Sequence, residues 1–245
     1  MTTYGPNEKV SLAVEDGVAE LRLEDPDRYN VFSPGLSADL LHHFADIEDR
    51  DDVSVVALTA EGSTFCAGLD LDIVQGDDPD AMDALRQNLD DVRNWLLETT
   101  LPVVAGATGA APGAGAILLA RSDIRIVGED VSIWWPENQL GMKAYEEAVF
   151  LVSALGAPKA TETMLMGDEA KISAEDAKTF GLVNRVVSTE DVDDTVRDIA
   201  GVIAEHDQEH GLTEEYMQVI QHARREENGA SQVYAKQLAK SLDLD

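Results

Sequence analysis

Ser63-Thr64-Phe65-Cys66-Ala67-Gly68-Leu69-Asp70-Leu71 is one glycine-bearing turn of this chain, and Gly109-Ala110-Ala111-Pro112-Gly113-Ala114-Gly115-Ala116-Ile117 is a second. A Pro136-Glu137 step follows both. Glycine lets a backbone turn tightly and approach a ligand closely. Two such turns can aim two backbone N–H groups at one carbonyl oxygen, which is an oxyanion hole. A carboxylate beside that hole would then move a proton on the polarised substrate.

The hydrophobic pattern around these turns predicts an α/β fold. Alternating apolar residues on either side of Asp16-Gly17 indicate a hairpin, with strands at 10–14 and 18–23. Further strands are expected at 53–59, 101–107, 124–127 and 182–187, and helices at 36–47, 82–97, 113–120, 146–155, 158–166 and 174–180. Strands that alternate with helices favour crossover connections. After residue 189 the pattern predicts helices alone, at 192–205, 213–225 and 231–242.

The charge of the chain is unusual. Its 245 residues include 18 Lys and Arg against 48 Asp and Glu, a net charge of −30 with a pI of about 4.2, and the acids are spread along the sequence. Such self-repulsion strains a fold in dilute buffer and largely disappears in molar salt, where the screening length falls to about 3 Å. We therefore expect a halophile's cytosolic protein; an acidic mesophile protein is the alternative. Either way the charge argues against nucleic acid and anionic membranes as partners.

The single cysteine and the first residues of the chain indicate in which compartment we expect the protein. Cys66 is the sole cysteine and cannot form an internal disulfide, which fits a reducing compartment, and the first residues contain no apolar signal region. Residues 99–120 carry no charge, but Pro102, Pro112 and four glycines favour a strand, a loop and a short helix over a membrane span. No spacing of His, Cys and Asp suggests a metal site, and His42 and His43 fall on an early helix.

Together these segments resemble the enoyl-CoA hydratase/isomerase (crotonase) family. Residues 55–68 look like its first oxyanion segment, residues 102–126 like its second, and residues 170–187 like the end of its core. The resemblance implies a spiral of β-β-α turns over residues 1–189. It also implies a helical C-terminal region at 190–245 that builds homotrimers or homohexamers.

The resemblance assigns roles to particular residues. The backbone N–H groups of Leu69 and Ala114 would be the oxyanion donors, neither of which depends on its side chain. Of the two glutamates that hydratases of the family use, the second is present as Glu137, whereas Ile117 stands at the first position. An apolar neighbour such as Ile117 would raise the pKa of Glu137 by desolvation.

One carboxylate favours isomerisation of an enoyl-CoA double bond over hydration. Hydration needs two acids to bracket a water, whereas moving a double bond needs one base that removes a proton and returns it two carbons away. Tyr145, Glu146 or Glu147 would be the source of a second acid, so hydration of 2-enoyl-CoA stays the runner-up. Hydrolysis or decarboxylation of acyl-CoA, and a subunit that binds without catalysing, are the remaining alternatives.

The ligand implied is coenzyme A as part of the substrate, with no permanently bound cofactor. By resemblance its contacts would be Arg28 at a phosphate, with Ala67, Leu69, Asp70, Leu71 and Gly113 around it. Lys236 and Lys240 in the last helix are weaker candidates. Trp134 and Trp135 stand where the family often has smaller residues, and either narrow the acyl pocket or pack in the core.

Overall fold

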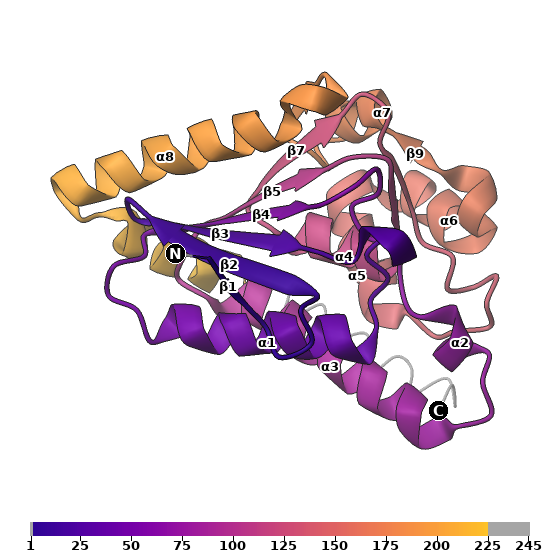
Figure 1. Ribbon diagram of the computed structural model, residues 1–245. Coiled ribbons are helices and arrows are strands. Elements are labelled where there is room, and N and C mark those ends of the chain that lie inside the picture. The colour runs from indigo at the N-terminus through magenta and orange to yellow at the C-terminus, as the bar shows by residue number, and fades with distance from the viewer. Residues whose placement is uncertain (1, 225–245) are drawn as a thin grey trace.

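A computed structural model describes residues 2–224, in which two sheets lie among helices (Figure 1). The larger sheet has the order β1-β2-β3-β4-β5-β7-β10, and the smaller β6-β8-β9. The strands of the large sheet are β1 (Thr2–Tyr4), β2 (Val10–Glu15), β3 (Val18–Leu23), β4 (Val55–Ala60), β5 (Val103–Ala107), β7 (Ile124–Gly128) and β10 (Arg185–Val187). Those of the small sheet are β6 (Ala110–Pro112), β8 (Ser132–Trp134) and β9 (Ile172–Ser173).

The predicted hairpin is confirmed. β2 and β3 pair antiparallel with Val10 opposite Leu23, and both turn residues, Asp16 and Gly17, have positive φ. From β3 onward the large sheet is parallel through β4, β5, β7 and β10. Parallel neighbours need crossovers, and the helical segments between the strands supply them.

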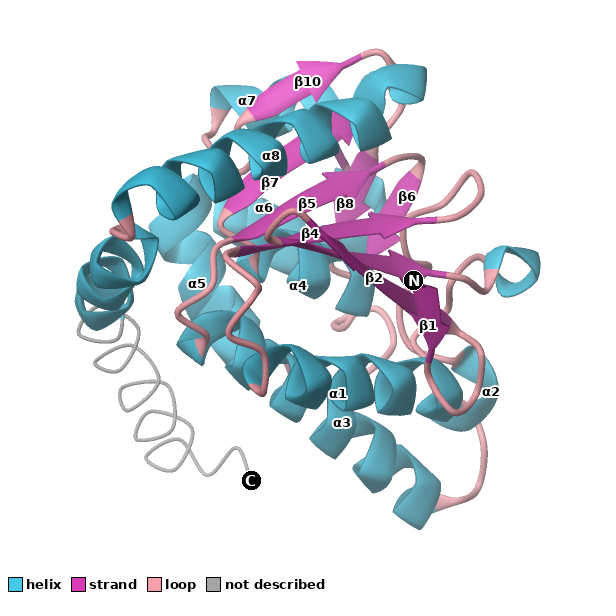
Figure 2. Ribbon diagram, turned by 60° about the vertical axis from the view of Figure 1, so that its left-hand side comes forward, coloured by secondary structure: helices cyan, strands magenta, loops and turns pink. Residues whose placement is uncertain are grey.

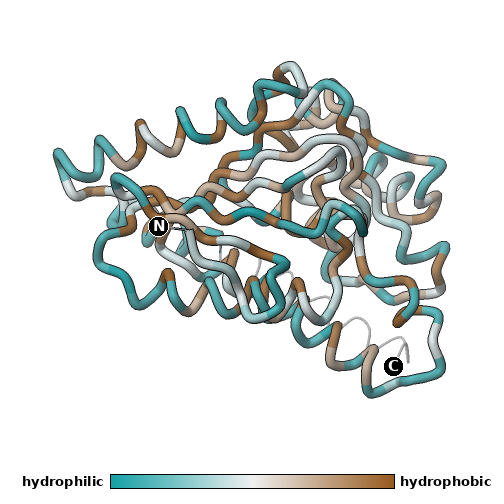
Figure 3. The backbone as a smooth tube through the Cα atoms, in the orientation of Figure 1, coloured by the Kyte–Doolittle hydropathy of each residue, from teal (hydrophilic) through white to brown (hydrophobic). Residues whose placement is uncertain are grey.

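The helices cover both faces of the large sheet. They are α1 (Pro34–Glu48), α2 (Leu71–Val74), α3 (Pro79–Glu98), α4 (Ala114–Arg121), α5 (Tyr145–Leu155), α6 (Ala157–Met166), α7 (Ala174–Thr179) and α8 (Val192–His210). Figure 1 shows α8 along one side of the sheet and α1 and α3 along the other, and Figure 2 shows α8 lying across the strands. In Figure 3 the side of α8 that faces away from the sheet is largely hydrophilic, as expected for a helix that buries one apolar stripe.

Small and branched residues let α8 pack closely on the sheet. Val196, Ala200 and Ala204 of α8 form a buried cluster with side chains of β4, β5 and β7. Polar contacts hold both ends: Arg22 Nη1 lies 2.7 Å from Asp193 Oδ2, and the Ser54 hydroxyl donates to Asp207 Oδ2 at 2.7 Å. The other face carries the main core, which α1, α3 and α4 share with the sheet.

Most predicted elements are present, with shifted ends. Four strands, β1, β6, β8 and β9, were not predicted. The strand expected at 182–187 is shorter, because the Leu182 N–H donates back to the Ala177 carbonyl and so keeps residue 182 in the turn. Residues 213–224 are helical as expected, and the helix predicted at 231–242 lies outside the described residues. Within residues 2–224 no helix combines the length and the apolar character that crossing a membrane requires.

The two glycine-bearing turns lie directly against one another. The Phe65 N–H donates to Thr108 O at 3.0 Å, so residues 63–68 run alongside β6 and the start of α4. The approach at Gly115 is very close, since a Cβ atom there would lie 2.2 Å from the carbonyl oxygen of Cys66. A backbone oxygen cannot yield by rotating, so this contact requires glycine.

Replacing Gly115 with alanine should therefore destabilise the protein by about 1–3 kcal/mol through overpacking. Gly201 on α8 is the matched control, because a Cβ atom there meets nothing within 4 Å. Gly201→Ala should stabilise the helix by about 0.5–1 kcal/mol. Denaturant unfolding in molar KCl measures both, and equal effects of the two substitutions would contradict the close contact at Gly115.

Candidate active site

A cavity of about 520 Å³ opens where the two turns meet the segment after β8. Much of its wall is apolar, and it includes most of the predicted residues of both turns together with Ile117 and Glu137. α3 and the start of α5 close the opposite side. The polar wall residues from those two helices are Arg86, Asp90, Arg93, Tyr145, Glu146 and Glu147.

Strand-like pairing orients the Leu69 N–H. Phe32 forms a parallel bridge with Leu69: its N–H donates to Gly68 O at 2.7 Å, and its carbonyl accepts from the Asp70 N–H at 3.2 Å. Because Phe32 uses the groups of residues 68 and 70, the N–H of the residue between them points to the other side. Gly68 has φ +87°, and a Cβ atom there would lie 3.0 Å from Pro112 O, which joins this turn to the second.

The second N–H comes from the start of a helix. Gly113 precedes α4 and donates its own N–H to Trp134 O at 2.9 Å, and Ala114 is the first helical residue. The first N–H groups of a helix have no partner inside it, and the helix dipole makes that end partially positive. Within residues 2–224, neither Leu69 nor Ala114 donates its N–H to another backbone carbonyl. Both residues line the cavity.

Glu137 places one carboxyl group in this apolar surrounding. Its side chain is buried, with Oε1 3.3 Å from the position that a Cβ atom on Gly113 would occupy. Oε2 has no hydrogen-bond partner among the described residues, and buried Ile117 lines the same wall. Burial, together with a smaller effect of the negative charge of Glu147, raises the pKa of Glu137 to about 7. A carboxyl group with that pKa can both accept and donate a proton near neutrality.

Arg93, Glu146 and Glu147 form the polar end of the cavity wall, and Arg121 pairs with one of these glutamates. Arg121 Nη2 lies 3.0 Å from Glu147 Oε1, and both side chains are almost wholly buried. Arg93 lies 3.7 Å from the same oxygen and 2.5 Å from Glu146 Oε2. The Arg121 guanidinium also lies 4.0 Å above the Phe150 ring. Both glutamates considered for a second acid therefore line the cavity, engaged by guanidinium groups.

The structure brings most of the predicted site residues together, but not all. Ala67, Leu69, Leu71, Gly113, Ala114 and Glu137 line the cavity. Arg28 and Asp70 are absent from the lining of this cavity and pair with each other at 3.0 Å, a contact that raises the pKa of Arg28. Trp134 lines the cavity with the Lys171 ammonium 4.3 Å from its ring, whereas Trp135 is fully buried in the core. Lys236 and Lys240 lie outside the described residues.

Arg93 and Arg121 were missed from the sequence. Arg121 had a signal, since it ends the long uncharged run that forms β5, β6 and α4 and so sits where a buried cation needs a partner. Arg93 had none, because it is one of several charged residues on the amphipathic α3. Arg86 and Lys143 are two further cations of the cavity wall, where a polyanionic ligand would need positive charge.

Comparisons with known proteins agree with the fold and the motifs. The sequence model of the family described as enoyl-CoA hydratase/isomerase matches residues 13–242. The 1,2-epoxyphenylacetyl-CoA isomerase of Escherichia coli is 30% identical over 196 residues, which are 78% of this chain and 74% of that protein. The chain therefore belongs to the enoyl-CoA hydratase/isomerase family and has the crotonase fold.

Two solved structures from Mycobacterium smegmatis are similar throughout. An enoyl-CoA hydratase superposes with a TM-score of 0.80 at 26% identity, covering 94% of this chain and 90% of that one. A monofunctional enoyl-CoA isomerase superposes with a TM-score of 0.72, also at 26% identity, covering 90% and 94%. One fold thus carries both reactions among the relatives.

The raised pKa of Glu137 predicts how stability changes with pH. Its carboxyl group has a pKa of about 7 when folded against an ordinary 4.5, so the folded state holds the proton more tightly. Its contribution to stability is full below pH 4.5 and is lost as pH rises through about 7. Each pKa unit corresponds to about 1.4 kcal/mol, so wild type should lose a few kcal/mol relative to Glu137→Gln across this window. Unfolding both proteins at several pH values measures it, and parallel curves would contradict the shift.

The buried Arg121–Glu147 pair predicts a non-additive stability effect. Arg121→Met should cost about 3–5 kcal/mol, because it removes the closer of the two cations paired with a buried carboxylate. The double substitution Arg121→Met with Glu147→Leu should cost much less, since no unpaired charge is left. A double-mutant cycle of unfolding free energies tests this, and additive losses would show that the pair is not coupled.

Proposed function

We propose that the protein moves the double bond of an enoyl-CoA thioester, with Glu137 as the base and then the acid. The single observation that carries the proposal is the environment of Glu137: a buried carboxyl group with one unpartnered oxygen, beside Ile117 and over the start of α4. A family hydratase would place its other glutamate at residue 117. The isoleucine there leaves Glu137 to act alone in this part of the wall.

The proposed reaction uses the two turns together. The N–H groups of Leu69 and Ala114 donate to the thioester oxygen and stabilise negative charge on it. Glu137 removes a proton from C2 of a 3-enoyl group, giving a dienolate, and returns it to C4 to give the 2-enoyl product. Losing one such donor typically costs about 10²–10³ in rate. Coenzyme A contacts would come from the turn at Ala67, Leu69 and Leu71, and no resident cofactor takes part.

Hydration of 2-enoyl-CoA is the second candidate, and Glu146 and Glu147 are the observation that favours it. Both carboxylates reach the wall of the same cavity as Glu137. The arginines that engage them argue for a role in charge pairing, which is why isomerisation is preferred. The relatives include a hydratase as well as isomerases, so this preference rests on the arrangement of the carboxylates. Hydrolysis, decarboxylation and binding without catalysis remain further alternatives.

The setting of the reaction is part of the proposal. A net charge of −30 supports a cytoplasm with molar salt, which screens the repulsion between this protein and a coenzyme A phosphate. Assembly into a homotrimer or homohexamer is proposed from the family, with residues 1–189 as the core and 190–245 as the assembling region. Exposed apolar side chains at Tyr216, Val219 and Ile220 support an interface in that region.

The proposed reaction predicts the products formed in heavy-oxygen water and molar KCl. Wild type should convert a 3-enoyl-CoA to the 2-enoyl isomer without label uptake, and Glu137→Gln should lower kcat by about 10²–10⁴-fold. Glu169→Gln, on an exposed carboxylate, is the matched control and should leave the rate unchanged. Chromatographic separation of the 3-enoyl and 2-enoyl isomers follows the isomerisation, and mass spectrometry of the products detects uptake of the label.

Each other outcome selects an alternative. Heavy-oxygen uptake by a 2-enoyl-CoA would replace isomerisation with hydration and direct attention to Glu147 as the second acid. Release of free coenzyme A would indicate hydrolysis. Thioester binding without any product, equal in wild type and Glu137→Gln, would favour the non-catalytic alternative.

A further inference from the structure

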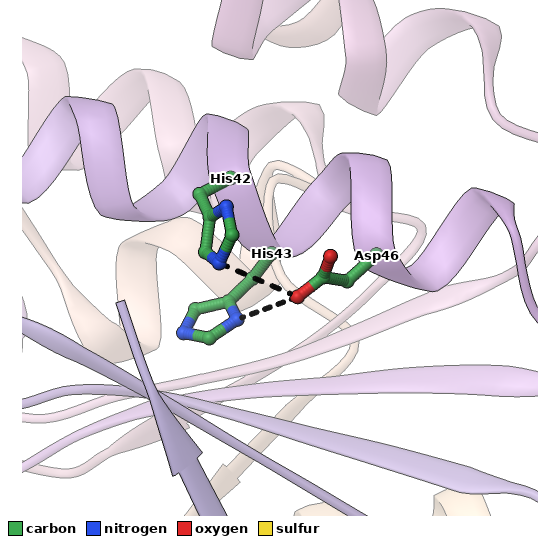
Figure 4. A group of neighbouring side chains, drawn as sticks. All are labelled: His42, His43 and Asp46. Atoms are coloured by element: carbon green, nitrogen blue, oxygen red, sulfur yellow. Dashed lines mark ion pairs between the residues drawn. The ribbon is translucent and has the colours of Figure 1, made fainter. Parts of the chain in front are cut away.

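Three side chains of α1, those of His42, His43 and Asp46, converge on one another (Figure 4). None of them lines the cavity. His42 and Asp46 are one helical turn apart, and His42 Nε2 lies 3.5 Å from Asp46 Oδ2. His43 Nδ1 lies 3.8 Å from the same oxygen. The three potential ligand atoms all lie within 4.8 Å of one another, and no other group of this kind occurs in the described part of the chain.

A hydrogen bond to β2 fixes the tautomer of the buried His43. His43 is fully buried, and its Nε2 lies 3.1 Å from the carbonyl oxygen of Val10 in β2. A carbonyl oxygen only accepts, so Nε2 carries the hydrogen and Nδ1 is left as a lone pair in the neutral ring. Burial lowers the pKa of His43, which favours that neutral ring. Nδ1 has no hydrogen-bond partner among the described residues.

In this arrangement the lone pair on His43 Nδ1 faces the carboxylate of Asp46. Two acceptors that point at each other repel unless a cation lies between them, and an orphaned buried nitrogen costs free energy. Metal-binding histidines typically donate their other ring N–H to a carbonyl or carboxylate, as His43 does to Val10. Two imidazole nitrogens and one carboxylate oxygen are donors that suit Zn²⁺ and its neighbours in the first transition row, and not Mg²⁺.

We propose that His42 Nε2, His43 Nδ1 and Asp46 Oδ2 form a binding site for a divalent transition metal ion such as Zn²⁺. Ligands about 2.0–2.1 Å from a tetrahedral ion lie about 3.4 Å apart, close to the two distances to Asp46. The side chains of His42 and Asp46 are half-exposed and can rotate to bring their ligand atoms to the ion. Water would be the fourth ligand, on the solvent side. The ion would fasten α1 to β2 through His43. The inference does not depend on the proposed reaction, because none of the three residues lines the cavity.

Zinc titration of the chelator-treated full-length protein in molar KCl tests the proposal. High salt screens loose cation binding by the acidic surface but not coordination. Wild type should bind one Zn²⁺ per chain in calorimetry, with a rise in Tm, and Co²⁺ should give the visible absorption of a nitrogen- and oxygen-ligated site. His42→Gln and Asp46→Asn should each raise Kd by about 10–100-fold or more and remove the Tm rise. Both residues are half-exposed, so these variants should fold.

His210→Gln is the matched control. His210 also lies beside a carboxylate on a helix, 3.7 Å from Glu209, but belongs to no such group of three. It should leave Kd unchanged. Cys66 does not compete for zinc, because it is buried and its thiol has a pKa raised to about 12. Zinc binding of equal strength in wild type, His42→Gln and Asp46→Asn, or a Tm rise of the same size with Mg²⁺, would overturn the proposal.

Discussion

The contact between the two glycine-bearing turns is the constraint on which the rest of the site depends. Gly115 meets the carbonyl of Cys66 at a distance that leaves no room for a side chain, and Gly68, with its positive φ, lies in tight contact with the carbonyl of Pro112. These contacts fix the start of α4 against the strand-like segment at Leu69. Leu69 and Ala114, from distant parts of the sequence, then line one cavity. The parallel sheet beneath them matters chiefly because it holds these two turns at the same edge.

Electrostatics divide the cavity wall into two parts. Around Glu137 the wall is apolar, and the carboxyl group there is neutral or charged according to pH, since burial brings its pKa to about 7. At the other end the wall carries Arg93, Glu146 and Glu147, which are paired charges, and Arg121 is a further partner of Glu147. Unpaired charge at that depth would be costly, so the arginines supply the partners that these carboxylates need. A ligand in the cavity would therefore meet a proton carrier at one end and paired charges at the other.

Much of the fold could be predicted from sequence, because long elements repeat a pattern often enough to be detected. The β2–β3 hairpin and α3 are examples. β6, β8 and β9 have two or three residues each, too few to show a period, and their pairing depends on partners far along the chain. In the site, family motifs led to Leu69, Ala114 and Glu137. The arginine cluster could not be found in this way, because α3 and α5 contact the end of α4 only in the folded chain. The sequence spacing predicted no metal site, and the proposed site at residues 42, 43 and 46 departs from that expectation because the burial of His43 and its bond to β2 appear only in the fold.

The use of backbone donors affects which mutations the site can tolerate. The polarising groups proposed at residues 69 and 114 belong to the peptide itself, so a substitution that keeps the local path of the chain leaves them intact whatever the new side chain is. The glycines that bring the turns together are far less free to change. Mutation can thus rewrite the residues around a substrate while the means of holding its oxygen passes on unaltered. A lineage built this way can acquire new substrates without reinventing its chemistry.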